Sequence, residues 1–154
     1  LHGMARRESA PRIEALAETL ELSTRLDAPF RSLSSGLQQR AGVMRALLHK
    51  PSVLLLDEPT RSLDPAAAKH FLNHLGRLAA EERLTILLAT HRAQDLPLAR
   101  RVCVMRQGAF VWEGTPARLA EMGAGSMDEA LAHLLEEGGA RACPDAIGAA
   151  GGAA

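Results

Sequence analysis

Residues 53–65, VLLLDEPTRSLDP, are the most informative stretch of this sequence about the fold. A continuous apolar run that ends in the carboxylates Asp57 and Glu58 is typical of a strand buried in a parallel sheet. The proline that follows cannot continue a central strand, so it marks the end of this one. Asp64 and Pro65 then suit the N-cap and the first position of a helix. The stretch therefore predicts a buried strand, a tight turn and a helix.

The rest of the chain predicts further helices and strands in alternation, with a hairpin near the end. Apolar residues recur at helical spacing before and after this stretch. A second apolar run follows it and predicts a second buried strand. This order predicts an α/β layered domain with a mostly parallel sheet and flanking helices. The expected elements are a helix over 11–25 with Pro11 in its first turn, a helix from 34–36 to 50, a strand over 52–59, a helix with Ala68, Phe71, Leu72, Leu75 and Leu78 on its apolar face, a strand over 84–90, a hairpin of 101–106 and 109–113, a short helix capped by Thr115, and a helix over 127–136.

Composition indicates one modest globular domain. The 154 residues are 47% hydrophobic and 23% charged, and the formal net charge is zero. A nucleic-acid partner is not expected, because such proteins usually show a basic excess. No apolar run approaches the length of a membrane span. Cys103 lies in an apolar run and is expected to be a buried free thiol, and two cysteines suggest no disulfide framework. A reducing, cytosolic setting fits.

Three polar residues follow the two predicted parallel strands. Asp57 and Glu58 end the first strand, and His91 follows the second. Ligands of open α/β sheets bind at the carboxyl ends of the strands. Asp57 is suited to hold Mg²⁺ through waters, and Glu58 to orient or deprotonate a water. His91 is suited to contact a phosphate or that water. An acidic turn and a lone polar residue at a strand end are the alternatives.

The stretch LSSGLQQR, residues 33–40, precedes an amphipathic helix and admits two interpretations. Ser34 can simply cap that helix, and Gly36 can permit the turn. Alternatively, free backbone N–H groups, the helix dipole and serine hydroxyls together bind a phosphate. Asp64 likewise makes a good N-cap by itself.

The order and spacing of these stretches are more specific than each alone. LSSGLQQR, LLLDEP, SLDP and ATH, in this order, resemble the second half of an ABC-type nucleotide-binding domain, which has the P-loop NTPase fold. They look like the signature motif, Walker B with its catalytic glutamate, the D-loop and the switch histidine. The resemblance covers roughly residues 1–122. LHGM and ALLHKPSVLLLDEPTRSLDP look most like exporter ATPases of the ABC-2 or drug-resistance type.

The resemblance implies ATP and Mg²⁺ as cofactors and a head-to-tail pair of subunits. Asp57 would help to hold Mg²⁺, Glu58 would be the general base, and His91 would contact the γ-phosphate. Asp64 would couple the two sites across the pair. The signature residues would bind ATP held by the opposite subunit; these are Ser34, Ser35, Gly36 and Gln39.

The sequence departs from the usual signature at two positions. Ser35 replaces the first signature glycine, which reduces backbone freedom and adds a hydroxyl. Leu37 replaces the usual glutamine, which removes a polar group. In addition, Arg92 follows His91 where the family often has an acidic residue.

The family's P-loop, G-x-x-x-x-G-K-[ST], does not occur in this sequence. Lys50 and Lys69, the two lysines, lack the glycine and the hydroxyl residue that the motif requires. We therefore expect the C-terminal half of a longer domain, which neither binds ATP tightly nor hydrolyses it alone. Its expected parts are the end of the helical subdomain (1–33), the ATPase core (34–122), a C-terminal helix (123–137) and a disordered tail (138–154).

The resemblance favours the ATPase subunit of a membrane exporter. Such a subunit would be cytoplasmic and peripheral at the inner face of the cell membrane, bound to a transmembrane permease. A non-transport ABC ATPase is one alternative. A non-catalytic assembly or regulatory module, which lends its signature motif to a partner's ATP site, is another.

Overall fold

The computed structural model describes residues 6–136, so the expectations for residues 1–5 and for the tail at 138–154 lie outside it. The chain divides into two compact units, Leu1–His91 and Arg92–Ala154. Each unit has its own core and is described by itself. None of the helices within the described range is long and apolar enough to cross a membrane.

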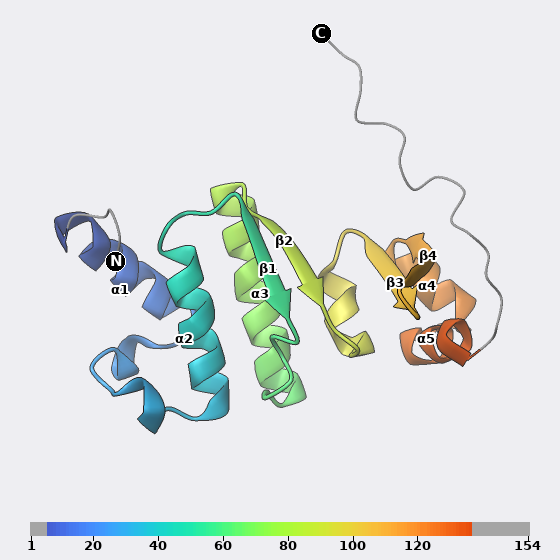
Figure 1. Ribbon diagram of the computed structural model, residues 1–154, viewed down its shortest axis with the longest axis horizontal. Helices are drawn as coiled ribbons and strands as arrows, with labels where there is room; N and C mark the ends of the chain where they lie inside the picture. Colours follow the sequence, from blue (N-terminus) through green and yellow to red (C-terminus); the bar gives the residue numbers. More distant parts are fainter. Residues whose placement is uncertain (1–5, 137–154) are drawn as a thin grey trace, which may run out of the picture. The chain divides into compact units, whose positions relative to one another are not determined.

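The first unit combines three helices with two parallel strands (Figure 1). Helix α3 covers one face of the pair β1–β2, and α1 and α2 precede the strands in the chain. Its elements are α1 (Arg6–Thr19), α2 (Ser35–Leu47), β1 (Val53–Asp57), α3 (Pro65–Glu82) and β2 (Thr85–Ala89), with short 3₁₀ turns at Ser23–Arg25 and Phe30–Ser32. This arrangement confirms the α/β class, with helices beside a small parallel sheet.

Strands β1 and β2 pair in parallel with a register from Val53↔Thr85 to Asp57↔Ala89. The ladder continues one step further, because the Glu58 N–H donates to the Ala89 carbonyl at 2.9 Å. The carboxyl ends of both strands therefore lie at one edge of the sheet, as the sequence predicts.

The core of the first unit lies on one side of the sheet. All five residues of the predicted apolar face of α3 are buried: Ala68, Phe71, Leu72, Leu75 and Leu78. Phe71, Leu72, Leu75 and Leu78 pack in one cluster with Leu54 of β1 and with residues of α1 and α2. A periodic apolar stripe of this kind finds its partners because helix and sheet each have one face to bury.

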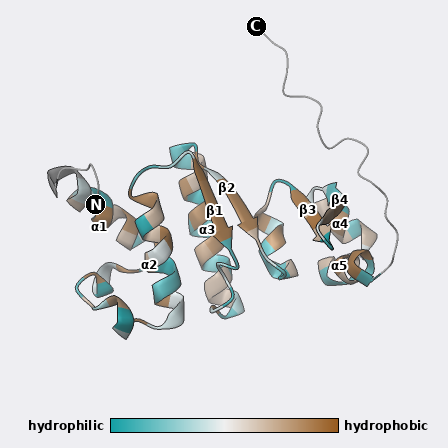
Figure 2. Cartoon of the chain, viewed as in Figure 1, coloured by the Kyte–Doolittle hydropathy of each residue, from teal (hydrophilic) through white to brown (hydrophobic). Residues whose placement is uncertain are grey.

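The expectation that the two parallel strands are buried is wrong for one of their two faces. Apart from Asp57 and Thr85 both strands are apolar (Figure 2), yet Leu55 is 70% exposed and Leu87 is 65% exposed. Side chains alternate between the two faces of a strand, and in the described residues a helix covers only the face of Leu54. The opposite face is therefore an exposed apolar surface.

The expected bounds of the first helix are also wrong. Helix α1 begins at Arg6, so Pro11 lies inside it, and it ends at Thr19 instead of continuing to 25. Glu21 adopts a positive φ of 57°. The N–H groups of Glu21 and Leu22 then close on the carbonyls of Glu18 (3.2 Å) and Ala17 (2.7 Å). This is the Schellman pattern of helix termination, here without glycine.

The second unit is a hairpin with two short helices. It comprises a 3₁₀ segment (Ala93–Leu98), β3 (Val102–Arg106), β4 (Ala109–Gly114), α4 (Pro116–Met122) and α5 (Met127–Glu136). Gln107 and Gly108 form the hairpin turn, both with positive φ, as two-residue turns of this type require. Cys103 is exposed, not buried, because β3 alternates and presents Val102 and Val104 to the core.

Candidate functional site

The ends of β1 and β2 bring Glu58 and His91 into direct contact. His91 Nδ1 lies 2.6 Å from Glu58 Oε1, a hydrogen bond whose donor is the imidazole when Nδ1 carries the proton. The side chain of Glu58 is 28% exposed, whereas that of His91 is 72% exposed. Glu58 Oε2 is buried and has no hydrogen-bond partner among the described residues. The pair thus combines an accessible imidazole with a carboxylate that keeps one oxygen unengaged.

The backbone at Glu58 is in the left-handed region, with a φ of 47°. Non-glycine residues adopt this conformation rarely, and it costs about 1 kcal/mol or more. The following turn is tightly closed: Arg61 N–H donates to the Glu58 carbonyl at 3.2 Å, and Leu63 N–H to the Thr60 carbonyl at 3.0 Å. Thr60 is fully buried. The turn therefore holds Glu58 in an orientation that a regular strand end would not provide.

Asp57, the last residue of β1, is exposed beside this pair. Among residues 6–136 there is no group of three His, Cys, Asp or Glu side chains that could hold a metal ion. Asp57 therefore belongs to no complete set of metal ligands in this part of the chain.

Residues 33–36, which we call the signature turn, lead into α2 and include its first two residues. Ser34 is the N-cap, and its hydroxyl accepts from the Leu37 N–H at 3.4 Å. Ser35 and Gly36 are the first two helical residues, so their N–H groups have no acceptor within the helix. The capping interpretation of Ser34 is therefore confirmed, and it leaves two N–H groups of the signature turn for another acceptor.

Gly36 lies against the segment that precedes α3. A Cβ atom at this position would stand 2.7 Å from Leu63 Cδ2 and 3.7 Å from the Ser62 carbonyl oxygen. Glycine thus permits a close approach of the signature turn to Ser62 and Leu63. The sequence separates these stretches by more than twenty residues, and the tertiary structure packs them together.

Asp64 caps α3, as the sequence predicts. Its Oδ1 accepts from the Ala67 N–H at 2.9 Å. This backbone hydrogen bond holds the pKa of the Asp64 carboxyl below its usual value, and the positive charge of Arg40 acts in the same direction. Asp64 is therefore ionised at neutral pH and engaged with its own helix.

An open groove of about 520 Å³ lies between α2 and β1. Ser35 and Gln39 line it from the helix, Asp57 from the end of the strand, and Ser62 from the turn. The groove therefore brings two candidate residues of the signature stretch together with the candidate Mg²⁺ ligand. Glu58 and His91 are not among its lining residues.

Two contacts of the signature stretch were not predicted from the sequence. The Gln38 amide bonds two carbonyls in front of α2. Arg40 pairs with Glu21 at the end of α1. No sequence pattern predicts the hydrogen bonds of Gln38, because a glutamine near a helix start has no preferred partner. The pair between Arg40 and Glu21 was not predicted because residue 21 was expected to lie inside a helix.

Comparison with known proteins agrees with the motifs. A sequence family described as "AAA domain, putative AbiEii toxin, Type IV TA system" matches residues 3–93. The chain is 40% identical over 107 residues to the ABC transporter ATP-binding protein YvcR of Bacillus subtilis, covering 70% of this chain and 41% of that protein.

Relatives of both transport directions are similar to this chain. The methionine import protein MetN 1 of Bacillus cereus is 40% identical, over 75% of this chain and 34% of that protein. The Nod factor export protein I of Burkholderia thailandensis is 38% identical, over 77% of this chain and 39% of that protein. The chain thus spans less than half of the length of these curated relatives.

Solved structures of ABC cassettes share the fold. CbiO1 from Clostridium perfringens superposes with a TM-score of 0.71 at 28% identity, over 86% of this chain and 52% of that one. The dimeric cassette MJ0796 gives a TM-score of 0.67 at 26% identity, over 75% of this chain and 50% of that one. The chain therefore belongs to the AAA domain family that matches it and, by its motifs and relatives, is part of an ABC-type ATP-binding domain.

Proposed function

We propose that this chain carries the catalytic carboxylate and the signature turn of the ATP-hydrolysing subunit of an ABC-type membrane exporter. The observation that carries the proposal is the 2.6 Å contact between Glu58 and His91 at the carboxyl ends of two parallel strands. Sheets of this class bind their ligands at that edge.

Glu58 is the general base in this proposal. His91 engages Oε1 and fixes the orientation of the carboxylate. Oε2 is buried and has no hydrogen-bond partner among the described residues, so a water would have to gain access to this oxygen before the carboxylate takes its proton. The His91 side chain is 72% exposed, and its second nitrogen would contact the γ-phosphate. Both residues would act on ATP whose phosphates are held elsewhere.

Mg²⁺ is compatible with the donors present at this edge. Asp57 is an exposed carboxylate, and Mg²⁺ in nucleotide sites is usually held by one or two carboxylates together with waters and phosphates. No group of three potential ligands occurs in the described part of the chain. Asp57 would thus hold the ion only together with the phosphates of the nucleotide, whose negative charge Mg²⁺ would partly neutralise.

The proposed partners are a second ATPase subunit and a transmembrane permease. Ser34, Ser35, Gly36 and Gln39 would serve ATP bound to the opposite subunit, and Asp64 would couple the two sites. MJ0796, a similar cassette, is dimeric. We place the subunit in the cytoplasm at the inner face of the membrane. We also propose the domain organisation expected from the sequence, with the ATPase core over 34–122.

The proposed direction of transport is export. It rests on the resemblance of LHGM and residues 46–65 to exporter ATPases. A neighbouring gene that encodes about six apolar spans would support the transporter assignment. Uptake or efflux measurements with that permease would decide the direction.

The experiment compares the chain as it is with a complete domain, made by extending the reading frame upstream to a P-loop. The 154 residues contain no P-loop, so we expect no ATP turnover by the chain alone. The complete domain should hydrolyse ATP, and Glu58→Gln should lower its turnover about 10²- to 10⁴-fold. Glu81→Gln, an exposed change on α3, is the control.

Two results would contradict the proposal. Turnover of the complete domain that is unchanged by Glu58→Gln would exclude Glu58 as the base. Turnover by the chain alone that Glu58→Gln abolishes would show that no P-loop is needed.

A non-catalytic module is the second candidate, because the start of α2 leaves the Ser35 and Gly36 N–H groups without an acceptor within the helix, whether or not Glu58 acts as a base. Such a module would lend its signature turn to a partner and would not need Glu58. An upstream stop codon, together with stimulation of a partner's ATPase by both the wild-type chain and its Glu58→Gln variant, would support this function.

A further inference from the structure

The side chain of Gln38 turns back over the start of α2. Its Nε2 donates to the Phe30 carbonyl at 3.2 Å and to the Leu33 carbonyl at 3.1 Å. The Phe30 carbonyl belongs to the segment that leads into the signature turn, and the Leu33 carbonyl belongs to the first residue of that turn. One half-buried amide therefore ties the approach segment, residues 30–33, to the helix that it precedes.

The other hydrogen bonds of this approach segment are local. Ser32 N–H donates to the Pro29 carbonyl at 2.8 Å, and Leu33 N–H to the Phe30 carbonyl at 3.2 Å. The Ser32 hydroxyl also bonds the Pro29 carbonyl, at 2.7 Å. These bonds shape the approach segment but do not connect it to α2. The two bonds of Gln38 supply that connection.

We propose that Gln38 is a positioning residue for the signature turn, which keeps the N–H groups of Ser35 and Gly36 in one orientation toward a phosphate. This inference rests on the proposed function, in which those groups meet ATP of the opposite subunit. Gln38 stands at the variable position of the signature pattern, so the resemblance assigns it no role. Holding the turn before the ligand arrives removes an ordering cost from binding.

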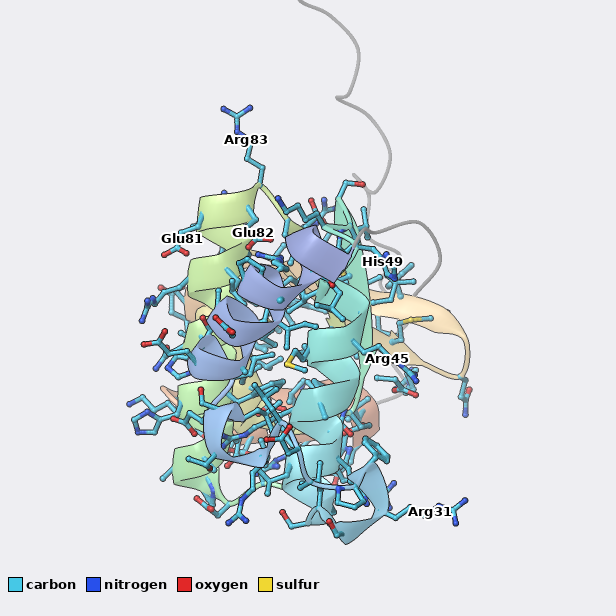
Figure 3. The ribbon with its side chains drawn as sticks, turned by 90° about the vertical axis from the view of Figure 1, so that its left-hand side faces the viewer. Arg31, Arg45, His49, Glu81, Glu82 and Arg83 are labelled. Carbon is cyan, nitrogen blue, oxygen red and sulfur yellow. The ribbon has the colours of Figure 1, made fainter. Side chains whose placement is uncertain are left out.

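The first test uses the 154-residue chain without nucleotide. Gln38→Glu keeps the shape but replaces the donor by a carboxylate that faces two carbonyls, whereas Gln38→Lys keeps a donor. Hydrogen exchange of the Ser32 and Leu33 amides should become about tenfold faster in Gln38→Glu and change little in Gln38→Lys. Arg45→Ala, a change of an exposed residue of α2 (Figure 3), is the control. Unchanged exchange in Gln38→Glu would overturn the positioning role.

The second test uses the complete domain. With Glu58→Gln as background, ATP-dependent pairing of subunits should require about tenfold more ATP when Gln38→Glu is added. Without that background, Gln38→Glu should raise KM for ATP and leave kcat nearly unchanged. If the parent pairs and Gln38→Glu has the same ATP requirement, Gln38 has no positioning role. If the Glu58→Gln domain with an unchanged Gln38 does not pair in the presence of ATP, the proposed function fails. The hydrogen-exchange data of the first test still decide whether Gln38 orders the approach segment.

Discussion

Arg12 joins the three helices of the first unit, and its removal should destabilise that unit measurably. The guanidinium of Arg12, on α1, forms a two-pronged ion pair with Glu82 at the end of α3, with Nη2 at 2.6 Å from Oε2. Nη2 also donates to the Leu47 carbonyl at the end of α2, at 3.1 Å. The side chains of Arg12 and Glu82 are 14% and 25% exposed. Such partly buried, charged hydrogen bonds contribute more than surface pairs.

The expected free-energy changes follow from these contacts. A hydrogen bond to a charged group contributes about 1.5–3 kcal/mol, and solvent access favours the lower end. Glu82→Gln should therefore lower the free energy of unfolding by about 1.5 kcal/mol. Arg12→Met also loses the bond to the Leu47 carbonyl and should cost about 2–3 kcal/mol. The double variant should show a coupling of about 1–2 kcal/mol between Arg12 and Glu82.

Glu81 provides the matched control. It precedes Glu82, but Figure 3 shows it on the outer side of α3, whereas Glu82 faces α1. Both carboxylates lie in the last turn of α3, where the helix dipole disfavours negative charge. Glu81→Gln should therefore be neutral or stabilise by a few tenths of a kcal/mol. The two variants should thus change stability in opposite directions.

The ion pair also predicts a pH dependence. The hydrogen bond from Arg12 lowers the pKa of the Glu82 carboxyl. A depressed carboxyl pKa gives stability that is complete above the unfolded value of about 4.3 and is lost as pH falls through the folded value. The difference between wild type and Glu82→Gln should hence shrink from pH 6 to pH 3.

Urea unfolding followed by circular dichroism at several pH values measures these quantities. Equal stability of wild type and Glu82→Gln at pH 7 would refute the reasoning. A difference that does not shrink at low pH would refute its electrostatic part.

Three further outcomes are expected. Phe71→Ala should lower the free energy of unfolding by about 3–5 kcal/mol in urea titrations, because Phe71 is 2% exposed in the core; a loss below 1 kcal/mol would contradict the packing. Gly36→Ala should leave the melting temperature nearly unchanged, because the added methyl group meets only Leu63 Cδ2, the end of a flexible side chain. The larger side chain of Gly36→Val should destabilise the protein by about 1–3 kcal/mol. Equal melting temperatures of the wild type and Gly36→Val would argue against the close approach. The Asp64 carboxyl should titrate below an ordinary aspartate by NMR, and Asp64→Ser should preserve the α3 cap that Asp64→Ala removes, as seen by amide exchange at Ala67.

Much of the fold could be predicted from local patterns. The stripe from Ala68 to Leu78, the caps at Ser34, Asp64 and Thr115, and the Gln-Gly hairpin all depend on residues close in sequence. The end of α1 could not, because Glu21 adopts a left-handed conformation that usually marks glycine. The exposure of Leu55 and Leu87 could not either, since an apolar run does not reveal whether both of its faces find partners.

In the candidate site, too, some features could be predicted from the sequence and others could not. Sequence alone determined which residue types end the two strands and begin α2, because strand ends, helix caps and motif order are encoded locally. Three contacts follow only from the folded structure: Glu58 touches His91, Gly36 lies against Leu63, and the Gln38 amide donates to the Phe30 and Leu33 carbonyls. The Glu58–His91 contact arises from the parallel register of β1 and β2, and the other two arise from how the loops pack against α2. Such pairings join groups that no local pattern of residues relates.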